Sequence, residues 1–273
     1  MEEKIILITG ASFGIGKETS LLLSKNNFKV YAAARSVDKI KEFANNNIVP
    51  IYMDVTDEES IKCCIEKIRN DEGKIDVVIN NAGYGLYGAL EDIPISEAKR
   101  QFDVNFFGLS LVVKYSLRLL RKAENGRIIN ISSVAGSFGE PLGSWYHASK
   151  YAVNGLTDSL RLELKGFGIK VINIKPGPIK TNWYDIAQNH MDQYNVSKDY
   201  EKLYLSNKKL WSQLWKFASI PEDVAKVIYK AVTSKNPKTV YYAGKMSKVL
   251  VTISKLLPNK IFDSVYLNLL KKI

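Results

Sequence analysis

A glycine-rich turn lies between the first strand-like segment of the chain and its first helical segment. The apolar run Ile5–Thr9 passes directly into residues 10–16, whose sequence is GASFGIG. Gly10 permits a tight turn, Gly14 lets the backbone approach a pyrophosphate, and Gly16 lets the helix pack close to the strand. The free N–H groups at the start of such a helix attract anions. The order strand, glycines, helix therefore predicts the dinucleotide loop of a βαβ unit, and a glycine-rich turn without a ligand is the alternative.

Strand-like and helix-like segments alternate along the first 180 residues. Apolar runs predict strands at residues 5–9, 29–34, 49–53, 75–80, 126–131 and 170–175, and helical patterns occupy residues 16–25, 56–70, 96–121 and 146–164. Thr56 is expected to cap the second of these helices, with Glu59 at the capping-box position. This alternation predicts a parallel sheet with helices on both faces, in a single doubly wound, Rossmann-like α/β domain.

The net charge of +11 is concentrated in the last third of the chain. Residues 1–181 carry 24 basic and 21 acidic side chains, whereas residues 182–273 carry 15 and 7. Residues 245–273 hold six Lys and one Asp. Such an excess fits either an anionic partner, such as nucleic acid or a membrane surface, or an ordinary solvated lysine surface. The hydrophobic fraction of 46% excludes a disordered chain.

Cysteine and histidine usage narrows the setting of the protein. The two cysteines, Cys63 and Cys64, are adjacent, and because a vicinal disulfide would be strained we expect reduced thiols packed in a core. This favours a reducing, cytoplasmic environment. The N-terminus lacks the layout of a signal peptide, and no apolar run is long enough to span a bilayer. No metal is expected, because neither His147 nor His190 has a partner at a metal-ligand spacing.

The end of the second expected strand indicates which dinucleotide binds. An acidic residue there would bind the adenosine ribose of NAD, whereas an arginine would pair with the 2′-phosphate of NADP. Ala34 stands at the acidic position and is followed by Arg35 and Ser36, a guanidinium and a hydroxyl that suit a phosphate. We therefore expect NADP(H), with NAD(H) as the alternative if Arg35 is only a surface residue.

Ser133, Tyr146 and Lys150 form a candidate catalytic set. Ser133 follows the strand at residues 126–131, while Tyr146 and Lys150 lie four residues apart on one face of the next helix. A free phenol has a pKa of about 10. A nearby ammonium lowers that pKa, so the pair could exchange a proton with a carbonyl or alcohol whose oxygen Ser133 holds. Each residue is common singly, but the joint occurrence after a dinucleotide loop is far more specific.

Together these motifs resemble the short-chain dehydrogenase/reductase family, in its shorter branch with a TGxxxGxG loop. The resemblance covers about residues 5–181, is weaker over residues 221–232, and is nearest to the 17β-hydroxysteroid dehydrogenase-like and retinol dehydrogenase-like reductases. The elements that match, in the order of the family, are Thr9–Gly16, Asp54, Asn80-Asn81-Ala82-Gly83, Asn105, Ser133, Tyr146-x-x-x-Lys150 and Pro176-Gly177. Some NADP-preferring relatives have a basic residue where this chain has Phe13, so Arg35 carries the NADP argument largely alone.

The resemblance implies a role for each matching residue. Tyr146 would donate or accept the proton, Lys150 would lower its pKa and bind the nicotinamide ribose, and Ser133 would orient the substrate carbonyl. Asn105 would hold a water in a proton relay, although its chemistry alone fits a helix-packing amide equally well. The implied substrate contacts are Ser133 and Tyr146.

The same resemblance supplies the cofactor contacts. Asp54 would contact the adenine, although it could equally be a turn-forming acid, and the turn at residues 81–83 would line the adenosine side. Pro176, Gly177 and Thr181 would clamp the nicotinamide carboxamide. The expected cofactor-binding residues are Gly10, Ser12, Phe13, Gly14, Ile15, Gly16, Arg35, Ser36, Asp54, Val55, Asn81, Ala82, Gly83, Tyr146, Lys150, Pro176, Gly177 and Thr181.

Beyond residue 181 the pattern changes, and three parts are expected. Residues 1–181 form the dinucleotide-binding and catalytic core, residues 182–220 insert a substrate lid, and residues 221–273 add a closing helix, a last strand near 239–242 and a basic amphipathic extension broken near Pro258. The lid aromatics either line an apolar pocket for a steroid-, retinoid- or lipid-like carbonyl or simply pack the lid helices; they are Trp183, Tyr184, Trp211, Trp215 and Phe217.

The leading hypothesis is an NADP(H)-dependent oxidoreductase that interconverts a carbonyl and an alcohol on a small apolar substrate. A non-catalytic dinucleotide-binding sensor and an anionic-surface binder are the alternatives. Residues 245–273 are expected either to form a peripheral membrane helix or to pack against the domain or a second subunit. Nucleic acid is not favoured as a partner. The resemblance implies a homodimer or homotetramer built through the helices at residues 96–121 and 146–164.

Overall fold

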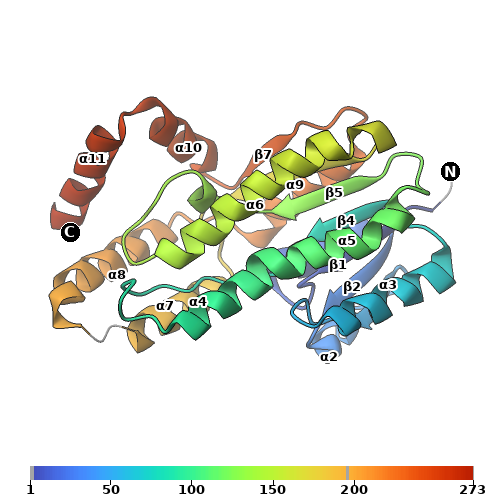
Figure 1. Cartoon of the computed structure of the whole chain (residues 1–273), viewed down its shortest axis with the longest axis horizontal. Coiled ribbons are helices and arrows are strands. Elements are labelled where there is room, and N and C mark those ends of the chain that lie inside the picture. The colour runs from blue at the N-terminus through green and yellow to red at the C-terminus, as the bar shows by residue number, and fades with distance from the viewer. Residues whose placement is uncertain (1–2, 195–196, 273) are drawn as a thin grey trace.

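The computed structural model describes residues 3–194 and 197–272, so Met1 and Glu2 of the acidic N-terminal segment lie outside it. Seven parallel strands form one sheet in the order β3-β2-β1-β4-β5-β6-β7 (Figure 1). The strands are β1 (Ile5–Thr9), β2 (Lys29–Ala34), β3 (Ile48–Tyr52), β4 (Val77–Asn80), β5 (Arg127–Ile131), β6 (Lys170–Pro176) and β7 (Val240–Ala243). The parallel α/β sheet predicted from the sequence is confirmed.

Helices cover both faces of the sheet, because alternate residues of each buried strand point to opposite sides. Ile5 and Leu7 of β1 belong to the core under α3 (Glu58–Glu72), α5 (Leu109–Leu120) and α6 (Ser144–Glu163). Ile6 and Ile8 belong to the opposite core, under α1 (Gly14–Ser24), α2 (Val37–Lys41) and α9 (Pro221–Thr233). The doubly wound arrangement leaves a crevice at the carboxyl ends of the strands, where the chain reverses from β1 to β4.

The single long helix expected at residues 96–121 is interrupted. It consists of α4 (Ile95–Phe102), the π-helical segment η1 (Asp103–Gly108) and α5. A π-helical turn inserts a residue into the ladder of hydrogen bonds, and such turns are frequent at functional sites. This one carries Asn105, a predicted site residue.

Two local predictions at α3 were wrong. The helix begins at Glu58 and is capped by Asp57, whose carboxylate accepts a hydrogen bond from the Glu59 N–H at 3.0 Å. Thr56 lies one residue before the cap, and its hydroxyl donates to Asp54 Oδ1 at 2.8 Å. Both cysteines are unpaired, but only Cys64 is buried and Cys63 is exposed. Neighbours on a helix point about 100° apart, so both cannot face one core.

Helices dominate the chain after β6. They are α7 (Trp183–Gln193), α8 (Glu201–Trp215), α9, α10 (Ser247–Leu256) and α11 (Asn259–Lys272), with short 3₁₀ turns η2 (Val134–Gly136), η3 (Lys165–Phe167) and η4 (Lys198–Tyr200) elsewhere. The break near Pro258 is confirmed. In Figure 1, α11 lies beside α8, and the two helices are in contact. No helix among the described residues has the length and apolar character needed to cross a bilayer.

Candidate active site

A cavity of about 520 Å³ opens along the carboxyl ends of β1, β4, β5 and β6. The strands of a parallel sheet end at the same edge, so loops far apart in sequence meet there. Every predicted site residue lines this cavity except Gly16 and Asn105. One sheet edge therefore brings together the residues singled out as cofactor-binding and those singled out as catalytic.

The glycine loop at one end of the cavity has no room for side chains. Gly10 and Gly14 have φ angles of +65° and +56°, a backbone region that favours glycine. A Cβ atom on Gly16 would lie 2.3 Å from the Gly10 carbonyl oxygen, and one on Gly10 would lie 2.8 Å from Ala82 Cα. These close approaches fix the conformation of the loop. The residue before α1 is Phe13, whose side chain cannot accept a hydrogen bond, so no side chain caps the first N–H groups of the helix. Such groups are suited to bind phosphate.

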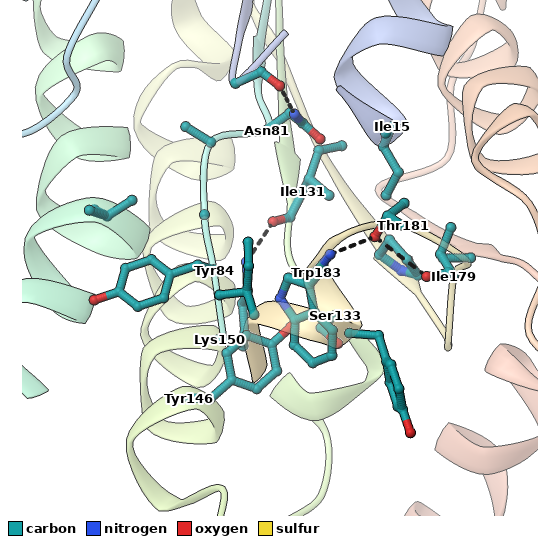
Figure 2. A pocket seen from close by; sticks show the side chains of 18 of the residues that line it. Ile15, Asn81, Tyr84, Ile131, Ser133, Tyr146, Lys150, Ile179, Thr181 and Trp183 are labelled. Atoms are coloured by element: carbon teal, nitrogen blue, oxygen red, sulfur yellow. Dashed lines mark hydrogen bonds between the residues drawn. The ribbon is translucent and has the colours of Figure 1, made fainter. Parts of the chain in front are cut away.

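Hydrogen bonds clamp the ends of β1 and β4 together behind this loop. The Thr9 hydroxyl accepts the N–H groups of Asn81 and Ala82, each at 3.1 Å. The Asn81 amide donates to the Thr9 and Gly10 carbonyl oxygens at 3.1 and 2.9 Å (Figure 2). Asn81 therefore holds the shape of the glycine loop in addition to lining the cavity. Thr9 was not among the predicted site residues, although it begins the TGxxxGxG motif.

Arg35 and Ser36 extend the cavity lining beyond the end of β2, and both side chains are exposed. Within residues 3–194 and 197–272, Arg35 makes no ion pair or side-chain hydrogen bond, so its guanidinium is available to an anion. Asp54 also lines the cavity, and its Oδ1 accepts the Thr56 N–H at 2.9 Å. Asp54 is therefore a turn-forming acid and, at the same time, a wall of the cavity.

Ser133, Tyr146 and Lys150 lie together at the other end of the cavity (Figure 2). Ser133 caps η2, accepting the Ala135 N–H at 3.1 Å, and its side chain lies close enough to Tyr146 to affect the pKa of the phenol. Lys150 Nζ donates to the Ile131 carbonyl oxygen at 3.1 Å and lies 5.8 Å from the centre of the Tyr146 ring. The strand end and the helix face thus bring a hydroxyl, a phenol and an amine to one point.

Burial shifts the titration of this set. Burial raises the pKa of Tyr146. The negative charge of Glu140 adds to this increase, whereas the nearby Ser133 hydroxyl opposes it. Burial also lowers the pKa of Lys150 to about 8. The sequence predicted that Lys150 would lower the Tyr146 pKa. In the structure the phenol lies in an aromatic cluster, and loss of water around it dominates, so the pKa is raised instead.

Asn105 lies behind the cavity, and hydrogen bonds occupy its side chain. Its amide donates to the Tyr84 carbonyl oxygen at 3.0 Å and to Ser149 Oγ at 3.1 Å, while its Oδ1 accepts the Tyr84 N–H at 3.0 Å. The π-helical segment η1 thereby holds the loop after β4 against α6. These contacts fit the helix-packing alternative, and the water relay stays a prediction.

The loop after β6 completes the middle of the cavity. Thr181 contacts the glycine loop, since a Cβ on Gly14 would lie 3.0 Å from Thr181 Cγ2. The Thr181 hydroxyl accepts the Trp183 N–H at 3.3 Å (Figure 2). Gly177 is held by its N–H, which donates to the Ala243 carbonyl oxygen at 2.9 Å. The start of α7 is thus held close to the glycine loop.

Aromatic rings form the wall opposite the sheet. Trp183 lies 5.2 Å from Tyr146, and Tyr184 stacks on Trp215 at 4.2 Å. Trp211 packs edge-on against Tyr87 at 4.4 Å. Four of the five predicted lid aromatics line the cavity, but Phe217 was predicted wrongly: it lies after the end of α8 and is 71% exposed.

Several lining residues had no signal in the sequence, among them Tyr84, Tyr87, Glu140 and His190. Tyr84, Tyr87 and Glu140 lie in loops without periodicity, and His190 lies on α7, so only the tertiary structure reveals which way these side chains point. No group of three or more His, Cys, Asp and Glu side chains in the described parts of the chain could hold a metal ion.

Comparisons with known proteins agree with this arrangement. A model of the short chain dehydrogenase family matches residues 4–192. The chain is 36% identical to a probable short-chain type dehydrogenase/reductase, VdlC, of Helicobacter pylori, over 95% of each chain. It is 37% identical to 3-ketodihydrosphingosine reductase of Bacteroides thetaiotaomicron, over 93% of each chain.

The solved structure of ElxO with NADP bound has 30% sequence identity to this chain and a TM-score of 0.73. The match covers 91% of this chain and 100% of ElxO. These proteins do not test the expected 17β-hydroxysteroid or retinol dehydrogenase-like branch, which stays a prediction. The matched family model spans more than two thirds of the chain and includes both ends of the cavity. This chain belongs to the short-chain dehydrogenase family of oxidoreductases.

Proposed function

We propose that this oxidoreductase uses NADP(H) to interconvert a carbonyl and an alcohol on an apolar, lipid-like substrate. The observation that carries the proposal is one cavity with an anion-binding loop and Arg35 at one end and Ser133, Tyr146 and Lys150 at the other. A sensor would need only the first of these ends. The presence of both in one cavity favours an enzyme over a sensor.

The residues of the cavity fit a dinucleotide. The close approaches at Gly10 and Gly16 leave no room for a Cβ, so the backbone can contact a pyrophosphate directly. Arg35 and Ser36 would hold the 2′-phosphate, and Thr181 would face the carboxamide. Similarity to ElxO, which has been solved with NADP bound, supports NADP(H) over NAD(H).

The side chains around Tyr146 suit carbonyl reduction. NADPH, when bound, supplies the hydride. Tyr146 donates its phenolic proton to the substrate oxygen, and because burial raises its pKa the phenol keeps that proton until the oxygen becomes basic. Ser133, which lines the cavity beside Tyr146, orients the same oxygen. Lys150 stabilises the phenolate that remains.

The aromatic wall favours a long or bulky apolar substrate. Tyr87, Trp183, Trp211 and Trp215 line the cavity around Tyr146, and apolar pockets with few polar groups bind ligands mainly by burial. Similarity to 3-ketodihydrosphingosine reductase supports a lipid-like ketone. In this proposal residues 182–220 act as the lid of a core formed by residues 1–181, and residues 221–273 close the sheet.

Absorbance of NADPH during incubation with a panel of carbonyls tests the proposal. The panel contains 3-ketodihydrosphingosine, a steroid ketone, retinal and a short aliphatic ketone, each with NADPH and with NADH. We expect turnover of a long apolar carbonyl with NADPH in preference to NADH. Tight NADPH binding without turnover of any member would support the sensor instead.

A second proposal concerns the C-terminal helices. Exposed apolar residues recur at helical spacing on α10 (Val249, Ile253, Leu256) and on α11 (Ile261, Val265, Leu269). On the neighbouring stripe of α11, Phe262, Tyr266 and Leu270 are half-buried or buried against the protein. Six Lys and one Asp accompany these stripes in residues 245–273. We infer that this surface docks on an anionic membrane, because two copies of so basic a face would repel each other.

Sedimentation with vesicles tests the docking surface. We expect the full-length protein to co-sediment with vesicles that contain phosphatidylglycerol and to be released by salt, whereas neutral phosphatidylcholine vesicles bind little. Leu256→Glu should abolish the binding. Equal binding to both vesicle types, or none to either, would contradict the inference.

We further propose a homodimer or homotetramer formed through α5 and α6. Tyr151 and Leu162 of α6 and Phe107 of η1 are large apolar side chains exposed on this side of the molecule. Light scattering should report two or four chains, and Leu162→Glu should shift the mass toward one chain. A monomeric wild-type protein would contradict the proposal.

A further inference from the structure

A carboxylate without an arginine or lysine partner lies in the substrate end of the cavity. Glu140 belongs to the loop between η2 and α6, lines the same cavity as Tyr146, and has a side chain 21% exposed. Among the described residues its ion-pair partner is His147, whose Nε2 lies 3.8 Å from Glu140 Oε2. This distance is too long for a direct hydrogen bond.

A neutral His147 ring cannot donate a hydrogen bond to the Glu140 carboxylate. His147 Nδ1 lies 2.5 Å from the Phe138 carbonyl oxygen, so Nδ1 must carry the proton. In a neutral ring Nε2 is then an acceptor and has no proton to donate to Glu140. Consistent with this, Nε2 is buried and has no hydrogen-bond partner among the described residues. Among the described residues, no side chain donates a hydrogen bond to the Glu140 carboxylate, which leaves it open to a donor in the cavity.

Aromatic rings surround the same part of the cavity. Tyr87 lies 5.6 Å from Tyr146 and 4.4 Å from Trp211, and all three line the cavity with Glu140. The negative charge of Glu140 contributes to raising the pKa of both Tyr87 and Tyr146. The faces of aromatic rings attract cations, and a carboxylate without a hydrogen-bond donor beside them favours a positively charged ligand.

We propose that Glu140 binds a protonated amine of the substrate, placed a few bonds from the carbonyl that Tyr146 protonates. The substrate class is thus an apolar amino ketone or amino alcohol. This inference rests on the proposed reductase function for the identity of the reacting group, although not for the binding of the amine itself. An uncharged hydroxyl at the same position would make a weaker hydrogen bond with Glu140 and leave its charge unbalanced.

The selectivity between two matched substrates tests the proposal. A long-chain 2-amino-3-ketone and the 2-hydroxy-3-ketone of equal length are reduced by wild type, Glu140→Gln and Glu163→Gln. Glu163 is an exposed acid at the end of α6. Its substitution is the matched control, because it removes the same charge away from the cavity. Wild type should prefer the amine in kcat/KM, and Glu140→Gln should lower that preference about 30-fold, since one partner of a desolvated charge pair is lost.

Glu163→Gln should leave the preference unchanged. Equal losses for both substrates in Glu140→Gln would indicate a structural role and overturn the proposal. A wild-type preference for the hydroxy ketone would do the same and would assign the site to a hydroxyl.

Direct binding separates this proposal from the proposed function. Decylammonium and decanol are titrated against the full-length protein, with the fluorescence of Trp183, Trp211 and Trp215, which line the cavity, as the signal. We expect decylammonium to bind wild type more tightly than decanol, and Glu140→Gln to remove the difference. If no carbonyl is reduced but this difference is found, the proposed function fails and the amine site stands. If decanol binds wild type equally well, the amine site is refuted.

Discussion

Lys150→Met should make the protein more stable at neutral pH, although it removes a residue of the active site. The Lys150 ammonium is buried, and its pKa falls from 10.5 to about 8. A difference of this size corresponds to about 3 kcal/mol of folding free energy at neutral pH. The Ile131 carbonyl oxygen loses the donor that it has at 3.1 Å, which costs about 1–2 kcal/mol. The net gain expected at pH 7 is therefore about 1–2 kcal/mol.

The pH dependence of this gain is the sharper prediction. Because the folded-state pKa lies below the unfolded value, the unfolded chain binds more protons between about pH 8 and 10.5, and wild-type stability rises with pH in that window. The cost in stability of burying the charged Lys150 ammonium is fully present below pH 8. Methionine does not titrate, so the free energy of unfolding of the variant relative to wild type should fall by about 2–3 kcal/mol between pH 7 and pH 10, which turns the gain at pH 7 into no gain or a small loss at pH 10.

Urea denaturation of both proteins across this range measures the difference in the free energy of unfolding. Groups such as Cys64, whose pKa burial raises to about 12, are common to both proteins and cancel. Lys165→Met, at an exposed lysine, is the control and should show no pH-dependent difference. A difference between Lys150→Met and wild type that does not change with pH would refute a desolvated Lys150.

Three further substitutions test other parts of the cavity. Arg35→Ala should weaken NADPH binding about 10- to 100-fold and leave NADH binding unchanged, because only NADPH carries the phosphate; equal weakening in fluorescence titrations would contradict this. Gly16→Ala should lower the melting temperature and abolish dinucleotide binding, since its Cβ would lie 2.3 Å from the Gly10 oxygen, whereas Gly166→Ala, with open space around it, should change neither. Trp211→Ala should raise the KM of a long-chain ketone about tenfold and spare a short one, because the ring packed on Tyr87 at 4.4 Å is lost; equal effects on both ketones would argue against an apolar wall.

The sequence was most informative where chemistry and local structure coincide. The glycine loop needs particular residues at a particular turn, and Tyr146 and Lys150 are brought together by one helical turn, so both could be predicted without tertiary structure. Ser133 joins them because parallel strands end at the same edge of the sheet.

Other features depend on packing that the sequence does not encode locally. The direction of each aromatic ring after residue 181 is set by contacts between helices, and this is why Trp211 lines the cavity while Phe217 is exposed. Glu140 lies in an irregular loop and gave no signal. The raised pKa of Tyr146 follows from burial, which outweighs the opposing effect of the neighbouring Ser133 hydroxyl. The π-helical turn at Asn105 interrupts what the apolar pattern predicts as one continuous helix.

Turnover by Tyr146→Phe, measured together with its NADPH affinity, tests the central claim most directly. Phenylalanine keeps the ring that packs at 5.2 Å from Trp183 and removes only the hydroxyl, so the cavity should stay intact. We predict that carbonyl reduction falls by about 10²- to 10⁴-fold, the contribution of a positioned general acid, while NADPH binds with nearly the wild-type affinity. A variant that reduces the carbonyl at the wild-type rate would contradict the assignment of Tyr146 as the proton donor.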